Sequence, residues 1–265
     1  MTRFRVVLSA DWHLDARTGG VERREEIKRA VMDGPVRAAV EGKADLFAFL
    51  GDLCDPGSRF AVSDVAFPIE VALRLSRAGG HPLAGRDDPG IPSAWVAGNH
   101  DVVLSESVRT TLDPLAEVAG SLVAGSCVVA REPLVAREAV VNLLLVPYVA
   151  APARSGHGWG GDGSFWPGLK LDPGLPLVVL GHCTSFPSSI TPGSEAAEFE
   201  RGRGQEWPAG VGRVAPVFRA NGHLHEPQEV ELPGGGTVHV PGSLVRLHFG
   251  DSERGRGFSL IDLEV

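Results

Sequence analysis

The sequence predicts an α/β fold in which two β-sheets pack face to face as a β-sandwich flanked by helices. Apolar runs of strand length alternate with helical segments over the first hundred residues, which indicates parallel strands joined by crossovers. From about residue 127 onward, short strand-like runs follow one another instead. With 265 residues, 43% of them hydrophobic, the chain can bury one large core, and we expect residues 1–265 to form a single domain.

Strands and helices are expected to alternate in the first half of the chain. The expected strands are the apolar runs Phe4–Leu8, Asp45–Leu50 and Trp95–Ala97. The second of these is almost continuously apolar, as in a strand that is covered on both faces. The expected helices are Glu22–Val40 and Val62–Ala78. Gly34–Pro35 should break or kink the first helix, because a proline inside a helix removes a backbone hydrogen bond.

The second half of the chain is expected to be mostly β-structure. It contains short apolar runs bounded by turn-forming residues, namely Cys127–Ala130, Val140–Val146, Leu177–Leu180, Val217–Ala220, Glu229–Leu232, Thr237–Val240 and Phe258–Leu263. Pro233–Gly236 predicts a hairpin turn. Pro152–Pro176 and Ser185–Gly212 lack regular patterning, and their position beside His182 favours loops that wall a functional site over simple surface excursions.

Charge, cysteine content and hydropathy narrow the range of functions. A net charge of −8 disfavours a broad basic surface for long nucleic acids, although it leaves room for a local one. The three cysteines are widely separated, so a disulfide framework is excluded. The longest apolar stretch, Ala139–Ala151, is shorter than the roughly 20 residues that span a bilayer. Because no signal peptide is recognisable at Met1–Arg5 either, we expect a cytoplasmic protein without a membrane partner.

The candidate functional residues occur in five short clusters, each directly after an apolar strand-like run. In chain order they are Asp11-Trp12-His13, Gly51-Asp52, Gly98-Asn99-His100-Asp101, Gly181-His182 and Gly222-His223-Leu224-His225. The loops after parallel strands meet at one edge of an α/β sheet. Carboxylate and amide oxygens and imidazole nitrogens suit divalent cations. A single histidine is more often a buried structural residue, but five clusters in this order predict a site for two neighbouring ions.

The spacing within the clusters indicates how the donors would be shared. Residues i and i+2 of a strand lie on one side, so Asp11 and His13 can reach one ion together. Asp52 suits a bridging position, because a carboxylate can give one oxygen to each ion. Two divalent ions, two carboxylates and one hydroxide leave a net positive centre, which would bind a phosphate anion and stabilise its transition state.

His100 follows Asn99 directly and has no obvious place in the ligand set. It is better placed to donate a proton to the leaving oxygen or to steady the phosphoryl oxygens. Asp101 or another carboxylate could hold its imidazole in the required tautomer.

The series D-x-H, G-D, G-N-H-D, G-H, G-H-x-H resembles the calcineurin-like metallophosphoesterase superfamily across nearly the whole chain. The resemblance implies an αββα two-sheet fold and a dinuclear centre of manganese, iron, zinc or magnesium, with manganese expected here. One ion would be held by Asp11, His13, Asp52 and His225. The other would be held by Asp52, Asn99, His182 and His223. His100 would be the catalytic histidine.

A narrower resemblance is to the SbcD/Mre11-type DNA-repair nucleases. It rests on Ser9–Leu14, Gly51–Asp55 and Asn221–Gln228, followed by Pro241–Leu244 and Gly257–Asp262. It implies a DNA nuclease that cleaves phosphodiester bonds by attack of a metal-bridging hydroxide. It also implies DNA and an SbcC/Rad50-like ATPase as partners, and it is compatible with a homodimer. Members of that branch usually continue into a capping domain, and we expect no separate one within residues 1–265.

Two alternatives stay open. The chain could hydrolyse nucleotides or other small phosphate esters as a phosphodiesterase or phosphatase. It could also be a non-catalytic scaffold that docks a partner ATPase, although the intact ligand set argues against this. Arg17 and Arg59 follow the first two ligand clusters and are candidates for contacts with substrate phosphates, with solvated surface arginines as an equal alternative.

Overall fold

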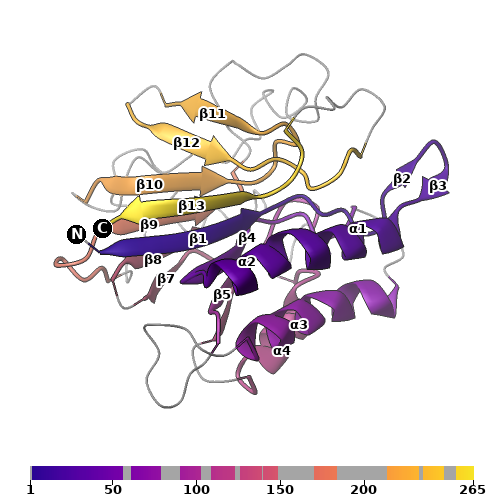
Figure 1. Cartoon of the computed structure of the whole chain (residues 1–265), viewed down its shortest axis with the longest axis horizontal. Coiled ribbons are helices and arrows are strands. Elements are labelled where there is room, and N and C mark those ends of the chain that lie inside the picture. Colours follow the sequence, from indigo (N-terminus) through magenta and orange to yellow (C-terminus); the bar gives the residue numbers. More distant parts are fainter. Residues whose placement is uncertain are drawn as a thin grey trace.

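Two mixed β-sheets pack face to face in the computed structural model (Figure 1), as the sequence predicts. The structure describes residues 2–55, 61–78, 90–102, 109–122, 126–138, 140–148, 170–183, 214–232, 235–247 and 255–265. The predicted loop 185–212 lies outside the described residues, and of 152–176 only residues 170–176 are described. Within the described part of the chain, no helix has the length and apolar character needed to cross a bilayer.

The first sheet has the strand order β13-β1-β4-β5-β6. Its strands are β1 (Arg3–Ser9), β4 (Leu46–Phe49), β5 (Ser93–Val96), β6 (Cys127–Ala130) and β13 (Ser259–Glu264). The first four run parallel in chain order, and β13 pairs antiparallel with β1. All five were predicted, because each is an apolar run bounded by turn-forming or charged residues. The parallel order means that the loops after β1, β4 and β5 emerge at the same edge.

The second sheet has the strand order β11-β12-β10-β9-β8-β7. Its strands are β7 (Leu134–Arg137), β8 (Asn142–Val146), β9 (Leu177–Gly181), β10 (Pro216–Asn221), β11 (Gln228–Glu231) and β12 (Thr237–Val240). The central strands β8, β9, β10 and β12 are parallel, and β7 and β11 pair antiparallel at the two edges. The predicted turn between β11 and β12 is closed by the Leu232 amide, which donates to the Gly236 carbonyl over 3.0 Å.

The helices lie on the outer face of the first sheet (Figure 1). The predicted helix 22–40 is observed as α1 (Arg24–Val31), a π-helical turn η1 (Met32–Val36) and α2 (Arg37–Gly42). The expected kink at Pro35 is therefore a widened turn rather than a break. The helix α3 (Val62–Ser76) matches its prediction, whereas α4 (Asp113–Ala119) and the small hairpin of β2 (Arg17–Thr18) and β3 (Val21–Glu22) were not predicted.

The central strands of the first sheet are buried on both faces, which explains why they are continuously apolar. Toward the second sheet, Val6, Leu8 and Ala48 pack against Leu145 and Leu180. Residues of the opposite face pack against the helices, and these include Val7, Phe47, Phe49 and Trp95. Trp12 joins this second core, with its ring centroid 4.4 Å from that of Phe49 and 5.7 Å from that of Trp95. The loop after β1 is thus anchored by a buried aromatic ring.

We expect Leu180→Ala to lower the free energy of unfolding by about 2–5 kcal/mol, because Leu180 is fully buried between the sheets and its loss leaves a cavity. Urea denaturation measures this value. Leu260→Ala is the matched control, because Leu260 on β13 is 43% exposed, and it should cost less than about 1 kcal/mol. Equal losses for the two variants would contradict the packing described for the sheet interface.

Candidate metal centre

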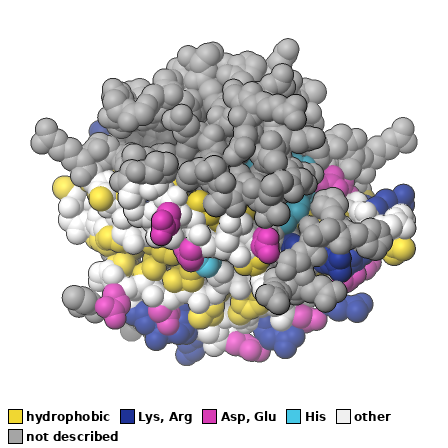
Figure 2. All heavy atoms as spheres, turned by 90° about the horizontal axis from the view of Figure 1, so that it is seen from above, with side chains coloured by type: hydrophobic (Ala, Val, Ile, Leu, Met, Phe, Trp, Pro, Cys, Tyr) yellow, Lys and Arg dark blue, Asp and Glu magenta, His cyan; other side chains and the backbone are white. Residues whose placement is uncertain are grey.

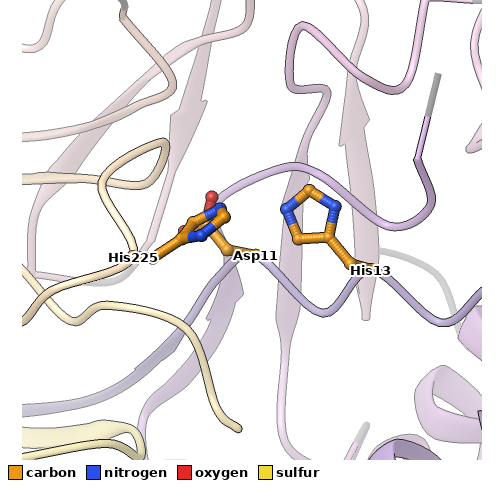
Figure 3. A group of neighbouring side chains, drawn as sticks. All are labelled: Asp11, His13 and His225. Carbon is orange, nitrogen blue, oxygen red and sulfur yellow. The ribbon is translucent and has the colours of Figure 1, made fainter. Parts of the chain in front are cut away.

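All seven predicted ligands follow the carboxyl ends of parallel strands. Asp11 and His13 follow β1, Asp52 follows β4, Asn99 follows β5, His182 follows β9, and His223 and His225 follow β10. Asp11, His13 and His225 each offer a ligand atom within 4.8 Å of the others (Figure 3). Asp52, His182 and His223 form a second such group. The Asn99 side-chain oxygen lies 2.9 Å from His182 Nε2 and 3.0 Å from His223 Nδ1, so it joins the second group.

Backbone hydrogen bonds hold the ligand loops side by side. The Asp11 amide donates to the Gly51 carbonyl over 2.9 Å, and the His13 amide donates to the Asp52 carbonyl over 3.1 Å. In the other sheet, the Gly222 amide donates to the Gly181 carbonyl over 3.0 Å. The loops after β1 and β4, and the ends of β9 and β10, therefore keep a fixed spacing.

Contacts between the sheets then join the two pairs of loops. The His223 amide donates to Asp11 Oδ1 over 3.0 Å, and His182 Nδ1 donates to the Leu50 carbonyl over 2.7 Å. Asn221 supports this end of the second sheet, because its Oδ1 accepts the Cys183 amide over 2.7 Å. Donors from both sheets consequently converge on one buried region.

Four predicted ligands have a strained backbone. The φ angles of Asp11, His13, Asp52 and His223 are 51°, 45°, 61° and 77°, in the left-handed region that residues with a side chain rarely adopt. Among the described non-glycine residues only Lys43, at the end of α2, shares this feature. Backbone strain of this kind persists where surrounding contacts over-determine it, and it is commonest at functional sites.

His13 is oriented by a carboxylate that the sequence analysis did not assign to the site. Its Nδ1 lies 2.6 Å from Asp55 Oδ1, and its Nε2 lies 3.9 Å from Asp52 Oδ2. A carboxylate on one imidazole nitrogen fixes the tautomer and leaves the other nitrogen free for a metal. In the sequence, the signal for Asp55 is a carboxylate three residues after Asp52 at the same strand end.

Asp55 also contacts His100, since its Oδ1 lies 3.7 Å from His100 Nδ1. Burial alone would raise the pKa of Asp55, but the interactions with His100 and His13 outweigh burial and hold it below its usual range. Asp55 is therefore the carboxylate that meets the catalytic candidate, whereas the sequence analysis named Asp101 first.

Asp101 has a different task, which is to hold two ligand loops together. Its carboxylate is fully buried and accepts the amides of Asp52 and Leu53 at 2.9 Å and the amide of Gly98 at 2.7 Å. The Thr111 hydroxyl donates a fourth hydrogen bond over 2.5 Å. Asp101 therefore connects the loop of Asp52 to the loop of Asn99 and His100.

The donor set fits two divalent cations. Asp11 Oδ2 and His13 Nε2 are buried atoms without a hydrogen-bond partner among the described residues, an arrangement that is costly unless another group binds them. Burial and the charge of Asp52 raise the pKa of Asp11 to about 7, because two negative charges this close repel each other in a buried site. Cations between these groups would offset that repulsion, and carboxylate oxygens with imidazole nitrogens are suitable ligands.

The second group of ligands also suits a cation. Because His182 Nδ1 donates to the Leu50 carbonyl, its Nε2 faces Asn99 Oδ1 at 2.9 Å and Asp52 Oδ2 at 3.3 Å. Burial lowers the pKa of His182, but the charge and hydrogen bond of Asp52, the charge of Asp11 and the Leu50 carbonyl together outweigh burial and raise it to about 9. Burial and the neighbouring His182 lower the pKa of His223 to about 3. Asn99, Asp52 and the two imidazoles thus point toward a shared position.

The two predicted substrate contacts, Arg17 and Arg59, are not tested by the described part of the structure. Arg17 is exposed on β2, four residues after His13, and its role stays a prediction. Arg59 lies outside the described residues.

Most of the chain matches one protein family. The profile of the calcineurin-like phosphoesterases matches residues 4–227, a region that includes His100 and every predicted ligand. The chain belongs to the calcineurin-like phosphoesterase family. It is therefore a metal-dependent phosphoesterase, a hydrolase, and its Asp and His clusters are consistent with a dimetal site. The match is to the broad family, and the narrower SbcD/Mre11 branch stays a proposal.

Several solved structures align with most of this chain at low sequence identity. Phosphopantetheinyl hydrolase from Mycobacterium tuberculosis is 15% identical, with 90% of this chain and 89% of that chain covered and a TM-score of 0.46. TT1561 of Thermus thermophilus is 14% identical, with 91% and 90% covered and a TM-score of 0.48. A dimetal phosphatase from Danio rerio is 10% identical, with 91% and 87% covered and a TM-score of 0.47. No curated protein matches the sequence. At these TM-scores the likenesses support no inference about this chain.

We expect Gly98→Ala to abolish metal binding at the position of Asp52. A Cβ atom at Gly98 would collide with the Asp52 carboxylate and would lie 2.5 Å from the Asp52 amide nitrogen, so the loop must shift. Metal analysis after dialysis measures the effect. Gly120→Ala is the control, because a Cβ there meets no atom within 4 Å, and it should bind metal as the wild type does. Full metal content in Gly98→Ala would refute the packing described here.

Proposed function

We propose that this chain hydrolyses phosphate esters of small molecules, nucleotides among them, at a dinuclear metal centre. The observation that carries the proposal is a pair of neighbouring ligand groups, Asp11 with His13 and His225, and Asp52 with His182 and His223, of which all but His225 are buried. The preference for small esters is supported by the net charge of −8. On the described part of the face in Figure 2, acidic and basic side chains are interspersed, and no continuous basic band crosses it.

Asp52 is the proposed ligand of both cations. Asp52 lies between the two groups, with its Oδ2 3.3 Å from His182 Nε2 and 3.9 Å from His13 Nε2, which suits a bridging ligand. Two divalent cations bound there would supply activation of water and stabilisation of the phosphate charge. We expect manganese, and the same mixed oxygen and nitrogen donors also accept iron, zinc or magnesium.

His100 is the proposed proton donor to the leaving oxygen. Its imidazole is 8% exposed, and its ring centroid lies 5.1 Å from that of His13. Because Asp55 meets its Nδ1, its Nε2 is the nitrogen that can face a substrate. Asp55 thereby supports both the ligand His13 and the proton donor.

The second candidate function is a DNA nuclease of the SbcD/Mre11 type. It is favoured by the residues that flank the ligands, since Ser9–Leu14, Gly51–Asp55 and Asn221–Gln228 resemble that branch. A DNA substrate, an SbcC/Rad50-like ATPase partner and a cytoplasmic location belong to this candidate as proposals. A local basic contact, for example through Arg17, would then have to offset the negative net charge.

A substrate panel separates the two candidates. In manganese we expect turnover of nitrophenyl phosphate esters and of cyclic nucleotides, with little cleavage of single- or double-stranded DNA. Comparing the nitrophenyl mono- and diesters distinguishes a phosphatase from a phosphodiesterase. Asp52→Ala prepared in parallel should be inactive, which excludes a contaminating enzyme. Activity confined to DNA would replace the first candidate by the second.

We expect His100→Ala to keep both metal ions and to slow turnover by about 10²–10⁴-fold, the usual contribution of a positioned proton donor. Asp52→Ala, in contrast, should lose the bridge, its metal ions and all activity. Metal content and turnover number measured on the same samples test this pair. A His100→Ala protein depleted of metal would show that His100 is a ligand instead.

A further inference from the structure

A part of the chain beyond the family-matched region reaches back to the loop of His225. The family profile ends at residue 227, whereas Ser243 and Arg256 follow it. Arg256 Nη1 donates to the His225 carbonyl over 2.7 Å, and the Ser243 amide donates to the same oxygen over 3.0 Å. Arg256 Nη1 also donates to the Ser243 hydroxyl. Two residues, Ser243 and Arg256, therefore hold one main-chain oxygen of a predicted ligand, and Arg256 is charged.

His225 needs such support more than the other histidine ligands do. His13, His182 and His223 are 1%, 0% and 5% exposed, whereas His225 is only half-buried. Its ring touches that of His13, with centroids 5.0 Å apart. Since surrounding side chains enclose it less, the position of its imidazole depends more on the main chain. Hydrogen bonds with a charged donor are about twice as strong as neutral ones, so the guanidinium is an effective anchor.

The same C-terminal segment also contacts the loop that carries Asp11 and His13. Ser243 forms a parallel β-bridge with Ala10, the residue before Asp11. The Thr18 hydroxyl donates to the Leu247 carbonyl over 2.7 Å. Residues 243–247 therefore connect the loop after β1 to the loop after β10. These two loops supply Asp11, His13 and His225, which are the ligands of one ion apart from the bridging Asp52.

We propose that Arg256 is a positioning residue for the ion held by Asp11, His13 and His225. It acts together with Ser243 through the His225 carbonyl. It has no effect on the ion held by Asn99 and His182. The proposal rests on the dinuclear centre described above. Groups that orient a metal ligand change metal affinity by about 10–100-fold when they are removed, which sets the expected size of the effect.

The test is a calorimetric titration of the metal-free protein with Mn²⁺. The wild type should take up two ions. Arg256→Met keeps the apolar stem and removes the donors, so it should bind one ion about 10–100-fold more weakly and the other ion unchanged. Arg256→Lys, which keeps a charged donor, should recover part of the loss. Should Arg256→Met fail to fold, Arg256→Gln replaces it, because its shorter side chain cannot reach the His225 oxygen.

Arg5→Met is the matched control. Arg5 likewise donates to a main-chain carbonyl, that of Gly42 over 2.7 Å, and it pairs with Asp262 on β13. It lies on β1 toward the end opposite to the ligand loop, so both ion affinities should match the wild type. Thermal unfolding of all variants shows whether a general loss of stability accompanies any change in affinity.

A double-mutant cycle tests the route through His225. His225→Ala should weaken the same ion, and adding Arg256→Met to it should change the affinity no further, because the two residues act as one unit. Wild-type affinity for both ions in Arg256→Met, equal weakening of both ions, or losses that add to those of His225→Ala would each overturn the proposal. A wild type that binds two ions and cleaves no small ester would refute the proposed function alone.

Discussion

The burial of Asp11 and Asp52 at the junction of the two sheets is the constraint on which the rest of the site depends. Each carboxylate is almost inaccessible to solvent, and burial together with the charge of Asp52 raises the pKa of Asp11. Asp101 is also buried, but four hydrogen bonds satisfy it. Asp11 keeps one oxygen without a partner among the described residues. This contrast distinguishes a carboxylate that holds the fold together from one that is ready for a cation.

The strands could be predicted from the sequence more completely than the short elements. Long apolar runs such as Asp45–Leu50 allow few other structures, because both of their faces must be buried. The edge strand β7 is short and flanked by charged residues, and α4 has only seven residues, so neither has a clear periodicity. The π-helical turn was predicted only as a break or kink at Gly34–Pro35, because a proline inside a helix removes a backbone hydrogen bond without specifying how the turn widens.

The candidate ligands could be named from the sequence because their order along the chain is a pattern, whereas the residues that support them could not. Asp55 orients His13 and meets His100, and Arg256 holds the His225 carbonyl. Each of these contacts joins residues that no spacing rule connects, so it is visible only after folding. From the sequence, the adjacent Asp101 is the first carboxylate expected beside His100. Proximity along the chain was a poor guide there, because Asp101 points to the amides of the neighbouring loop.

The left-handed backbone at Asp11, His13, Asp52 and His223 restricts how this protein can be engineered for heat resistance. Each such residue costs on the order of 1–3 kcal/mol. Glycine would relieve the strain, because it adopts the left-handed region without a steric penalty, but it would delete a proposed metal donor. At these four positions a gain in thermal stability would therefore cost catalytic function. A thermostable variant has to gain its stability elsewhere in the fold.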